Sequence, residues 1–426
     1  MAISRGNGGT PRVVVSGIGV VSPFGAGRER FWEHVRCGNS GTRAITQFDV
    51  STYPCRVAAW VPPVSVDDAP VLEGDDDHDG RADPKRYSRT ALFGVVAARE
   101  AWHDAGLRVG ESNAGVLIGS GGGGIDIGER QYQDFFTTGG RHVTPYAIAL
   151  GICGMISSEI SISLGLRGIS HVLSCGCTSS TDAIGYAATL IRAGEYDVLL
   201  TGGADGCVVA SMIFGFSRMR VVSTHFNHRP DEASRPFDRD RDGFVLGEGA
   251  YMLVLEREDR ALARGVRPYA VVEGYGSTCD AYHRVQMDPE GDQIVRCMQG
   301  ALDKAGRRVE EIGYINYHGT STQLNDAIES RCVRRLFGAR AERVPGSSTK
   351  SMIGHPQGAS GAAGVVATAL GLARGVLPPT INLDDPDPAC DLDFIPKQPR
   401  EVEVEAALCN CLGFGSKNSA LVLGRA

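Results

Sequence analysis

Cys177 combines a nucleophilic side chain with a position where strand-like sequence gives way to helix-like sequence. Residues 172–180 read Val-Leu-Ser-Cys-Gly-Cys-Thr-Ser-Ser, which is typical of a short strand and a tight turn. Beyond this turn, apolar side chains recur with helical spacing at Ile184, Ala187, Ala188 and Ile191. The free N–H groups and the positive dipole at a helix start favour a thiolate. Cys177 is therefore a candidate covalent nucleophile if a histidine serves it, whereas we assign Cys175 the buried structural role of most free cysteines.

Two histidines in the second half of the chain could serve this nucleophile. His318 follows a strand-like run and begins the sequence His-Gly-Thr-Ser-Thr. His355 lies in a segment at 347–361 that is rich in glycine and hydroxyl side chains. A third glycine-rich segment, Asn-Cys-Leu-Gly-Phe-Gly-Ser-Lys-Asn, occupies residues 410–418. Because glycine lets the backbone approach a ligand closely, the three segments predict one site shared with Cys177.

In these motifs the chain resembles the β-ketoacyl-acyl-carrier-protein synthases, the condensing enzymes of the thiolase superfamily. The specific combination is a Gly-Cys-Thr nucleophile with His-Gly-Thr-x-Thr and Lys-Ser-x-x-Gly-His. The likeness covers nearly the whole chain, with further matching segments at 12–22, 234–238, 241–249, 377–383 and 419–424. The resemblance implies an α/β, thiolase-like fold, in which two related halves form a five-layer helix-sheet-helix-sheet-helix stack.

The resemblance also implies roles for the three reactive side chains. Cys177 would accept an acyl chain from an acyl carrier protein, and His318 and His355 would hold the developing enolate oxygen during malonyl decarboxylation. Donors are needed because loss of carbon dioxide leaves a carbanion that is stabilised as its enolate. The resemblance leaves open which histidine contributes more and whether a water attacks the leaving carboxylate. It implies no flavin, nicotinamide or other cofactor.

Further positions match residues around this centre. Lys350 and Glu329 match an ion pair that organises the site, since an unpaired buried lysine is costly, and Asp326 is expected in the same polar network. Phe414 matches a gating aromatic side chain. Its backbone N–H, together with that of Cys177, is the expected oxyanion hole.

Three positions would contact the substrate. Thr320 and Thr322 match hydroxyls that hydrogen-bond the pantetheine arm, although they could instead cap local turns. Gly122 stands where an elongation enzyme has a bulky isoleucine, so its missing side chain predicts a larger acyl pocket.

Departures from the elongation enzymes favour polyketide synthesis. The sequence Gly-Cys-Thr-Ser is similar to the ketosynthase subunits of type II polyketide synthases, and Ser416 follows the gate where elongation enzymes have glycine. We therefore expect two-carbon extension of a polyketide, including reduced or polyene chains, with malonyl-acyl-carrier protein. Three alternatives stay open: fatty-acid elongation, a thiolase with Cys411 as its second cysteine, and a chain-length-factor-like partner subunit. The presence of Cys177 argues against the partner subunit, because such subunits usually lack the nucleophile. The resemblance also implies a homodimer or a heterodimer with a chain-length-factor-like subunit.

Composition limits other functions. The 426-residue chain carries a net charge of −7 and no dense basic run, so nucleic-acid binding is not expected. No apolar run is long enough to span a membrane, the polar N-terminus does not resemble a signal peptide, and the scattered cysteines indicate a reducing cytoplasm. The pairs Cys175-Gly-Cys177 and Cys409-Asn-Cys411 lack zinc-site spacing, so we predict no metal. The acidic segment 66–80 is expected to be a solvated loop.

A weak internal duplication predicts the organisation of the chain. Residues 13–20 and 270–277 both read as an apolar strand with a glycine-rich turn, and strands alternate with helices in both halves, which implies mainly parallel layers. We expect a disordered tail at 1–10, an N-terminal half at 11–260 with the nucleophile, and a C-terminal half at 261–426 with the histidines.

Overall fold

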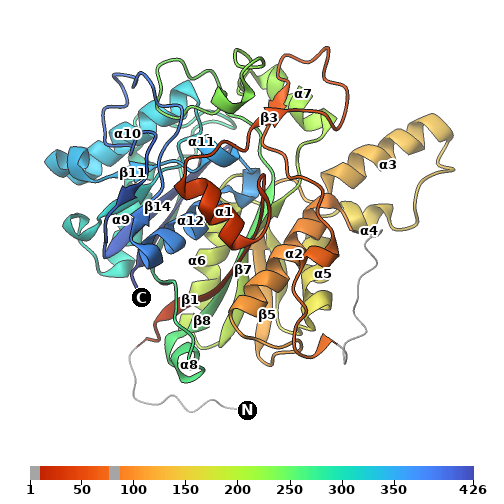
Figure 1. Cartoon of the computed structure of the whole chain (residues 1–426), viewed down its shortest axis with the longest axis horizontal. Helices are drawn as coiled ribbons and strands as arrows, with labels where there is room; N and C mark the ends of the chain where they lie inside the picture. Colours follow the sequence, from red (N-terminus) through yellow and green to blue (C-terminus); the bar gives the residue numbers. More distant parts are fainter. Residues whose placement is uncertain (1–9, 76–86) are drawn as a thin grey trace.

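A single sheet of eleven strands runs through the computed structural model, which describes residues 10–75 and 87–426 (Figure 1). Its strands are β1 (Val13–Ser22), β2 (Gly25–Ala26), β5 (Ala114–Gly119), β6 (Ser170–Leu173), β7 (Val198–Asp205), β8 (Gly249–Arg257), β9 (Ala270–Cys279), β10 (Tyr314–Asn316), β11 (Gly346–Ser347), β14 (Ala406–Gly413) and β15 (Lys417–Gly424). Across the sheet they follow the order β11-β10-β14-β15-β9-β1-β8-β7-β5-β6, with β2 beside β1. The predicted tail at 1–10 lies outside the described residues, except for its last residue.

The two halves of the sheet repeat one pairing pattern. β5 pairs in parallel with β6 and β7, and β10 pairs in parallel with β11 and β14. The strands β7-β8-β1 and β14-β15-β9 then continue antiparallel. The halves meet where β1 pairs with β9. The expectation of mainly parallel layers was therefore wrong for the central strands, because a short hairpin connects β14 to β15 and only antiparallel neighbours can be joined that way.

Three layers of helices separate and cover the two halves of the sheet. α6 (Ser179–Arg192) and α12 (Ser360–Arg374) form one core with strands of both halves. α2 (Arg89–Asp104) and α5 (Gly154–Leu164) pack on the N-terminal half, and α9 (Asp292–Ala305) and α10 (Gln323–Phe337) pack on the C-terminal half. α12 is apolar or small on nearly every side because it is buried all round. These layers are the predicted helix-sheet-helix-sheet-helix arrangement of the thiolase-like fold.

Smaller elements complete the described chain. The other helices are α1 (Arg28–Arg36), α3 (Ile125–Thr138), α4 (Ala147–Gly151), α7 (Ala210–Met219), α8 (Glu258–Ala263) and α11 (Lys350–Ile353), and two small ribbons pair β3 (Arg43–Ala44) with β4 (Val57–Ala58) and β12 (Val376–Leu377) with β13 (Arg400–Glu401). α3 projects away from the body of the molecule (Figure 1). None of the described helices is both long and apolar enough to cross a bilayer.

Candidate active site

Cys177 lies on the turn between β6 and α6. Gly176 has φ +73°, in the left-handed region that glycine adopts without strain. The Ser179 hydroxyl accepts from the Cys175 N–H (2.8 Å) and donates to the Gly176 carbonyl (2.6 Å). These bonds fix the turn, so that Cys177, which is 6% exposed, is held just before the first residue of the buried helix α6.

The two histidines converge on this cysteine from the C-terminal half. His318 follows the end of β10, and His355 lies between α11 and α12. The Cys177 sulfur and one ring nitrogen of each histidine all lie within 4.8 Å of one another. The two imidazole rings are 5.3 Å apart and nearly perpendicular, and both side chains are buried. The fold therefore assembles one thiol and two imidazoles into a single buried cluster.

Glu329, on α10, holds the backbone that carries His318. Its carboxylate accepts from the N–H groups of His318 (2.8 Å) and Gly319 (2.9 Å), and the Asn410 side-chain amide donates to it at 3.3 Å. Lys350 and Glu329 attract each other as charges, but no ion pair within 4 Å joins them among the described residues, so the lysine acts on this carboxylate at longer range. Burial raises the pKa of Glu329 to about 7, and the positive charge of Lys350 opposes this rise in pKa.

His355 is fixed through its backbone rather than its ring. Its N–H donates to the Val245 carbonyl (2.7 Å), and its own carbonyl accepts from the Gly247 N–H (3.0 Å). Its buried Nδ1 has no hydrogen-bond partner among the residues that the structure describes. Burial, and then the charge of Lys350, lower the pKa of both His318 and His355 far below the usual value, so both rings are neutral at pH 7.

The nucleophile rests as a thiol. Burial raises the pKa of Cys177 to about 12, and nearby Cys411 adds to that rise, whereas the Phe414 N–H and Lys350 favour the thiolate. The helix start favours the thiolate, but burial outweighs this effect on the pKa of Cys177. A neutral imidazole within reach can accept the thiol proton when the thiol reacts.

A cavity of about 270 Å³ opens onto the three reactive side chains. Phe414, on the loop between β14 and β15, forms part of its wall. Thr320 and Thr322 also line the cavity, and their hydroxyl oxygens are 2.9 Å apart. The Thr322 hydroxyl also accepts from the Asn325 N–H (3.4 Å) at the start of α10, so this threonine both caps a helix and faces the cavity.

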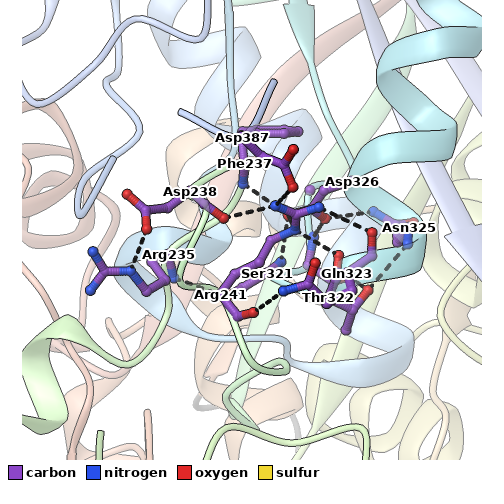
Figure 2. Close-up of polar contacts among 12 residues, drawn as sticks. Arg235, Phe237, Asp238, Arg241, Ser321, Thr322, Gln323, Asn325, Asp326 and Asp387 are labelled. Atoms are coloured by element: carbon purple, nitrogen blue, oxygen red, sulfur yellow. Dashed lines mark hydrogen bonds and ion pairs between the residues drawn. The ribbon is translucent and has the colours of Figure 1, made fainter. Parts of the chain in front are cut away.

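Asp326 and Arg241 hold the loop between His318 and α10 (Figure 2). The Asp326 carboxylate accepts from the N–H groups of Thr320 (3.0 Å) and Ser321 (3.2 Å). The buried Arg241 guanidinium lies 3.6 Å from this carboxylate and donates to the Thr322 carbonyl (3.1 Å). Sequence reasoning gave Arg241 no role, because an arginine in an acidic segment reads as a surface residue. The sequence signal for a role of Arg241 was its position in the segment 241–249, which matches the β-ketoacyl synthases.

Gly122 does not line this cavity. Its N–H donates to the buried Asp205 carboxylate (2.8 Å), and a Cβ built on it would lie 2.3 Å from the Cys207 sulfur. The glycine makes room for Cys207, and the larger acyl pocket inferred from its missing side chain stays a prediction.

The cluster of Cys177, His318 and His355 is also the one group of His, Cys, Asp and Glu side chains within residues 10–75 and 87–426 that has the spacing of a metal-ligand set. A thiol beside two neutral imidazoles can also catalyse acyl transfer. In that reaction a ring nitrogen takes the proton of the thiol, and the resulting thiolate attacks the acyl group.

Comparisons with known proteins agree with this arrangement. Residues 10–261 match the "Beta-ketoacyl synthase, N-terminal domain" family and residues 269–384 match the "Beta-ketoacyl synthase, C-terminal domain" family. The chain is 40% identical to the 3-oxoacyl-[acyl-carrier-protein] synthase 2 of Coxiella burnetii over 420 residues, which cover 97% of this chain and 98% of the relative. It is also 40% identical to the Synechocystis enzyme of that name over 413 residues, which cover 96% and 97% of the two chains.

Two solved structures extend the likeness. The ishigamide ketosynthase/chain length factor has a TM-score of 0.90 at 33% identity, and a type II PKS ketosynthase in complex with its acyl-carrier protein has a TM-score of 0.88 at 29% identity. Each match covers 98% of this chain and all of the other chain. The fold and the buried thiol–imidazole cluster are those of a condensing enzyme. The chain belongs to the β-ketoacyl synthase family, whose members are acyl-carrier-protein-dependent acyltransferases.

Proposed function

We propose that this chain extends a polyketide by two carbons, through decarboxylative condensation of an acyl chain on Cys177 with malonyl-acyl-carrier protein. The observation that carries the proposal is the buried cluster in which the Cys177 sulfur and the two imidazoles lie within 4.8 Å of one another beside one cavity.

The first half-reaction loads the enzyme. A neutral imidazole takes the Cys177 proton, and the thiolate attacks the thioester carbonyl of the acyl carrier protein. The Cys177–acyl thioester forms as the pantetheine thiol leaves with a proton. The backbone N–H groups of Cys177 and Phe414 hold the oxyanion, which is consistent with the Phe414 N–H favouring the thiolate at this sulfur.

The second half-reaction makes the carbon–carbon bond. Malonyl carrier protein loses carbon dioxide, and the electron pair stays on the remaining two-carbon unit as an enolate. His318 and His355 donate to the enolate oxygen, and Thr320 and Thr322 bind the pantetheine arm. The carbanion attacks the Cys177 thioester, the carbon–sulfur bond breaks, and the β-ketoacyl chain leaves on the carrier protein. The released Cys177 thiolate takes a proton from solvent and is again a thiol. Glu329, Lys350 and Asp326 position these groups without touching the reacting atoms.

The polyketide substrate is supported by the Gly-Cys-Thr-Ser nucleophile sequence and by the likeness to the ishigamide ketosynthase/chain length factor. Fatty-acid elongation is the second candidate, and the 40% identity to 3-oxoacyl-[acyl-carrier-protein] synthase 2 proteins favours it. A thiolase is less well supported, because Cys411 does not line the cavity. A non-catalytic partner subunit is less well supported because the nucleophile and both histidines are present.

A second subunit of the same fold is the proposed partner, either another copy or a chain-length-factor-like chain. β6 is an edge strand of the sheet, so its outer hydrogen-bonding groups are available for pairing. The helices α3 and α4, which contact each other, and the residue after α4 expose large apolar side chains at Tyr132, Phe135, Phe136, Ile148 and Ile152. Such a patch is typical of an interaction surface.

The substrate test compares matched carrier proteins. Purified enzyme, alone and with candidate partner subunits, receives poly-β-keto, polyene and saturated acyl carrier proteins of equal chain length, together with malonyl carrier protein. The proposal expects faster extension of the unsaturated or keto chains. Exclusive extension of saturated chains would assign the enzyme to fatty-acid elongation instead.

A further inference from the structure

A second buried cysteine touches both parts of the reactive cluster. Cys411, near the end of β14, is 1% exposed. Its sulfur lies 3.0 Å from the carbonyl oxygen of Cys177 and 3.7 Å from Nδ1 of His318. It is absent from the cavity wall, although the next residues, Leu412 and Gly413, form part of that wall. Cys411 can therefore influence the reaction only through the groups that it contacts.

Cys411 has one S–H and two possible acceptors, the Cys177 carbonyl and Nδ1 of His318. The other donors near each acceptor indicate which of them depends on Cys411. The Cys411 thiol donates to the Cys177 carbonyl at 3.0 Å, but this carbonyl has a second donor, the Ser360 hydroxyl at 3.3 Å, and stays bonded if the S–H turns to His318. Nδ1 of His318 has Cys411 as its one hydrogen-bond partner within the described part of the chain. The two acceptors are both satisfied when Ser360 serves the carbonyl and Cys411 serves the imidazole.

The geometry also separates the two nitrogens of His318. The ring lines the cavity while its Nδ1 faces buried Cys411, so Nε2 is the nitrogen left for the cavity. A neutral imidazole carries one proton, and the hydrogen bond at one nitrogen determines which nitrogen holds it. An S–H that donates to Nδ1 therefore leaves the proton on Nε2.

We propose that Cys411 is a positioning residue, whose thiol donates to Nδ1 of His318 and holds that ring as the tautomer with a proton on Nε2. This inference rests on the proposed function, in which His318 donates a hydrogen bond to the enolate oxygen. The low pKa that burial gives His318 supports it, because only a neutral ring has a tautomer to fix.

The test uses three variants and two independent readouts. Cys411→Ala removes the donor, Cys411→Ser keeps one, and Cys409→Ala is the matched control. Cys409 is a buried thiol on the same strand, and it donates to the Thr368 hydroxyl at 3.3 Å instead of to a histidine. The tautomer of His318 is read from its ¹⁵N chemical shifts, assigned with His318→Gln, and malonyl decarboxylation is measured separately from acyl loading.

We expect the parent, the serine variant and the Cys409 control to hold His318 with its proton on Nε2. Cys411→Ala should lose this single tautomer and decarboxylate about tenfold more slowly, the effect of one neutral hydrogen bond, with loading retained. A proton on Nδ1 in the parent, or an unchanged tautomer in Cys411→Ala, overturns the proposal whatever happens to the rates. A parent that fails to decarboxylate malonyl carrier protein counts against the proposed function, while the ¹⁵N shifts still judge the role of Cys411.

Discussion

The Arg241 guanidinium and the Asp326 carboxylate lie 3.6 Å apart, and both side chains are buried. The Asp326 carboxylate accepts from the Thr320 N–H and so holds the loop that presents Thr320 to the cavity. Because Arg241 belongs to the N-terminal half, the pair connects that half to this loop of the C-terminal half (Figure 2).

Arg241→Met should destabilise the protein strongly, because it leaves the Asp326 carboxylate buried without its cation. The expected loss in the free energy of unfolding is about 3 to 5 kcal/mol. Arg239→Met is the matched control: Arg239 pairs with Asp385 on the surface, and such pairs contribute roughly 0 to 1 kcal/mol. Urea unfolding measures both variants, and equal losses would refute the importance of the buried pair.

His318→Ala and His355→Ala should each slow malonyl decarboxylation about 100- to 1000-fold, since each removes a donor to the developing oxyanion. Acyl loading should fall less. His225→Ala, which changes an exposed histidine outside the cavity wall, is the control. Parent-rate decarboxylation by both alanine variants would show that these roles are wrong.

The pKa of about 12 for Cys177 predicts a strong pH dependence of alkylation. Below that pKa the thiolate fraction rises about tenfold per pH unit, so iodoacetamide should modify Cys177 roughly a hundredfold faster at pH 9 than at pH 7. The modification is followed on the peptide that contains Cys177 by mass spectrometry. A rate that is already constant above pH 7 would indicate a resting thiolate and contradict the buried thiol.

Glu329 predicts a pH dependence of stability. Its ordinary pKa of 4.5 is raised to about 7 in the folded protein, so between these values the folded chain binds more protons than the unfolded chain. The free energy of unfolding should therefore fall as pH rises from about 4.5 to 7, by at most about 3.4 kcal/mol. Glu329→Gln, which cannot titrate, should lack this part of the pH dependence. Parallel stability curves for parent and variant would exclude a raised pKa at this position.

The family resemblance of the motifs predicted the thiolase-like fold, and apolar periodicity predicted individual elements within it. The strand expected at 13–20 is β1, and the residues with helical spacing from Ile184 to Ile191 lie in α6. The antiparallel pairing of the central strands was not predicted. The direction of a strand relative to its neighbour depends on how the chain connects them in space, and the pattern of apolar residues within a strand does not contain that information.

Individual site residues were also predictable where a side chain reaches the cavity directly, as for Cys177 and the two histidines. The surroundings of Glu329 and Gly122 were not, because they depend on which backbone groups and side chains arrive from other elements. Gly122→Ile would press on Cys207, and loading of Cys177 by short and long acyl carrier proteins would test whether the variant also narrows the acyl pocket.

The central claim is that the growing chain is carried on Cys177, and intact-mass analysis with peptide mapping tests it most directly. After incubation with an acyl carrier protein, we expect one acyl group on Cys177, none on Cys177→Ala, and undiminished loading of Cys175→Ala. Malonyl carrier protein should then discharge that group as a β-ketoacyl chain two carbons longer. An acyl group on Cys175 or Cys411, or product formation without any adduct on Cys177, would contradict the account.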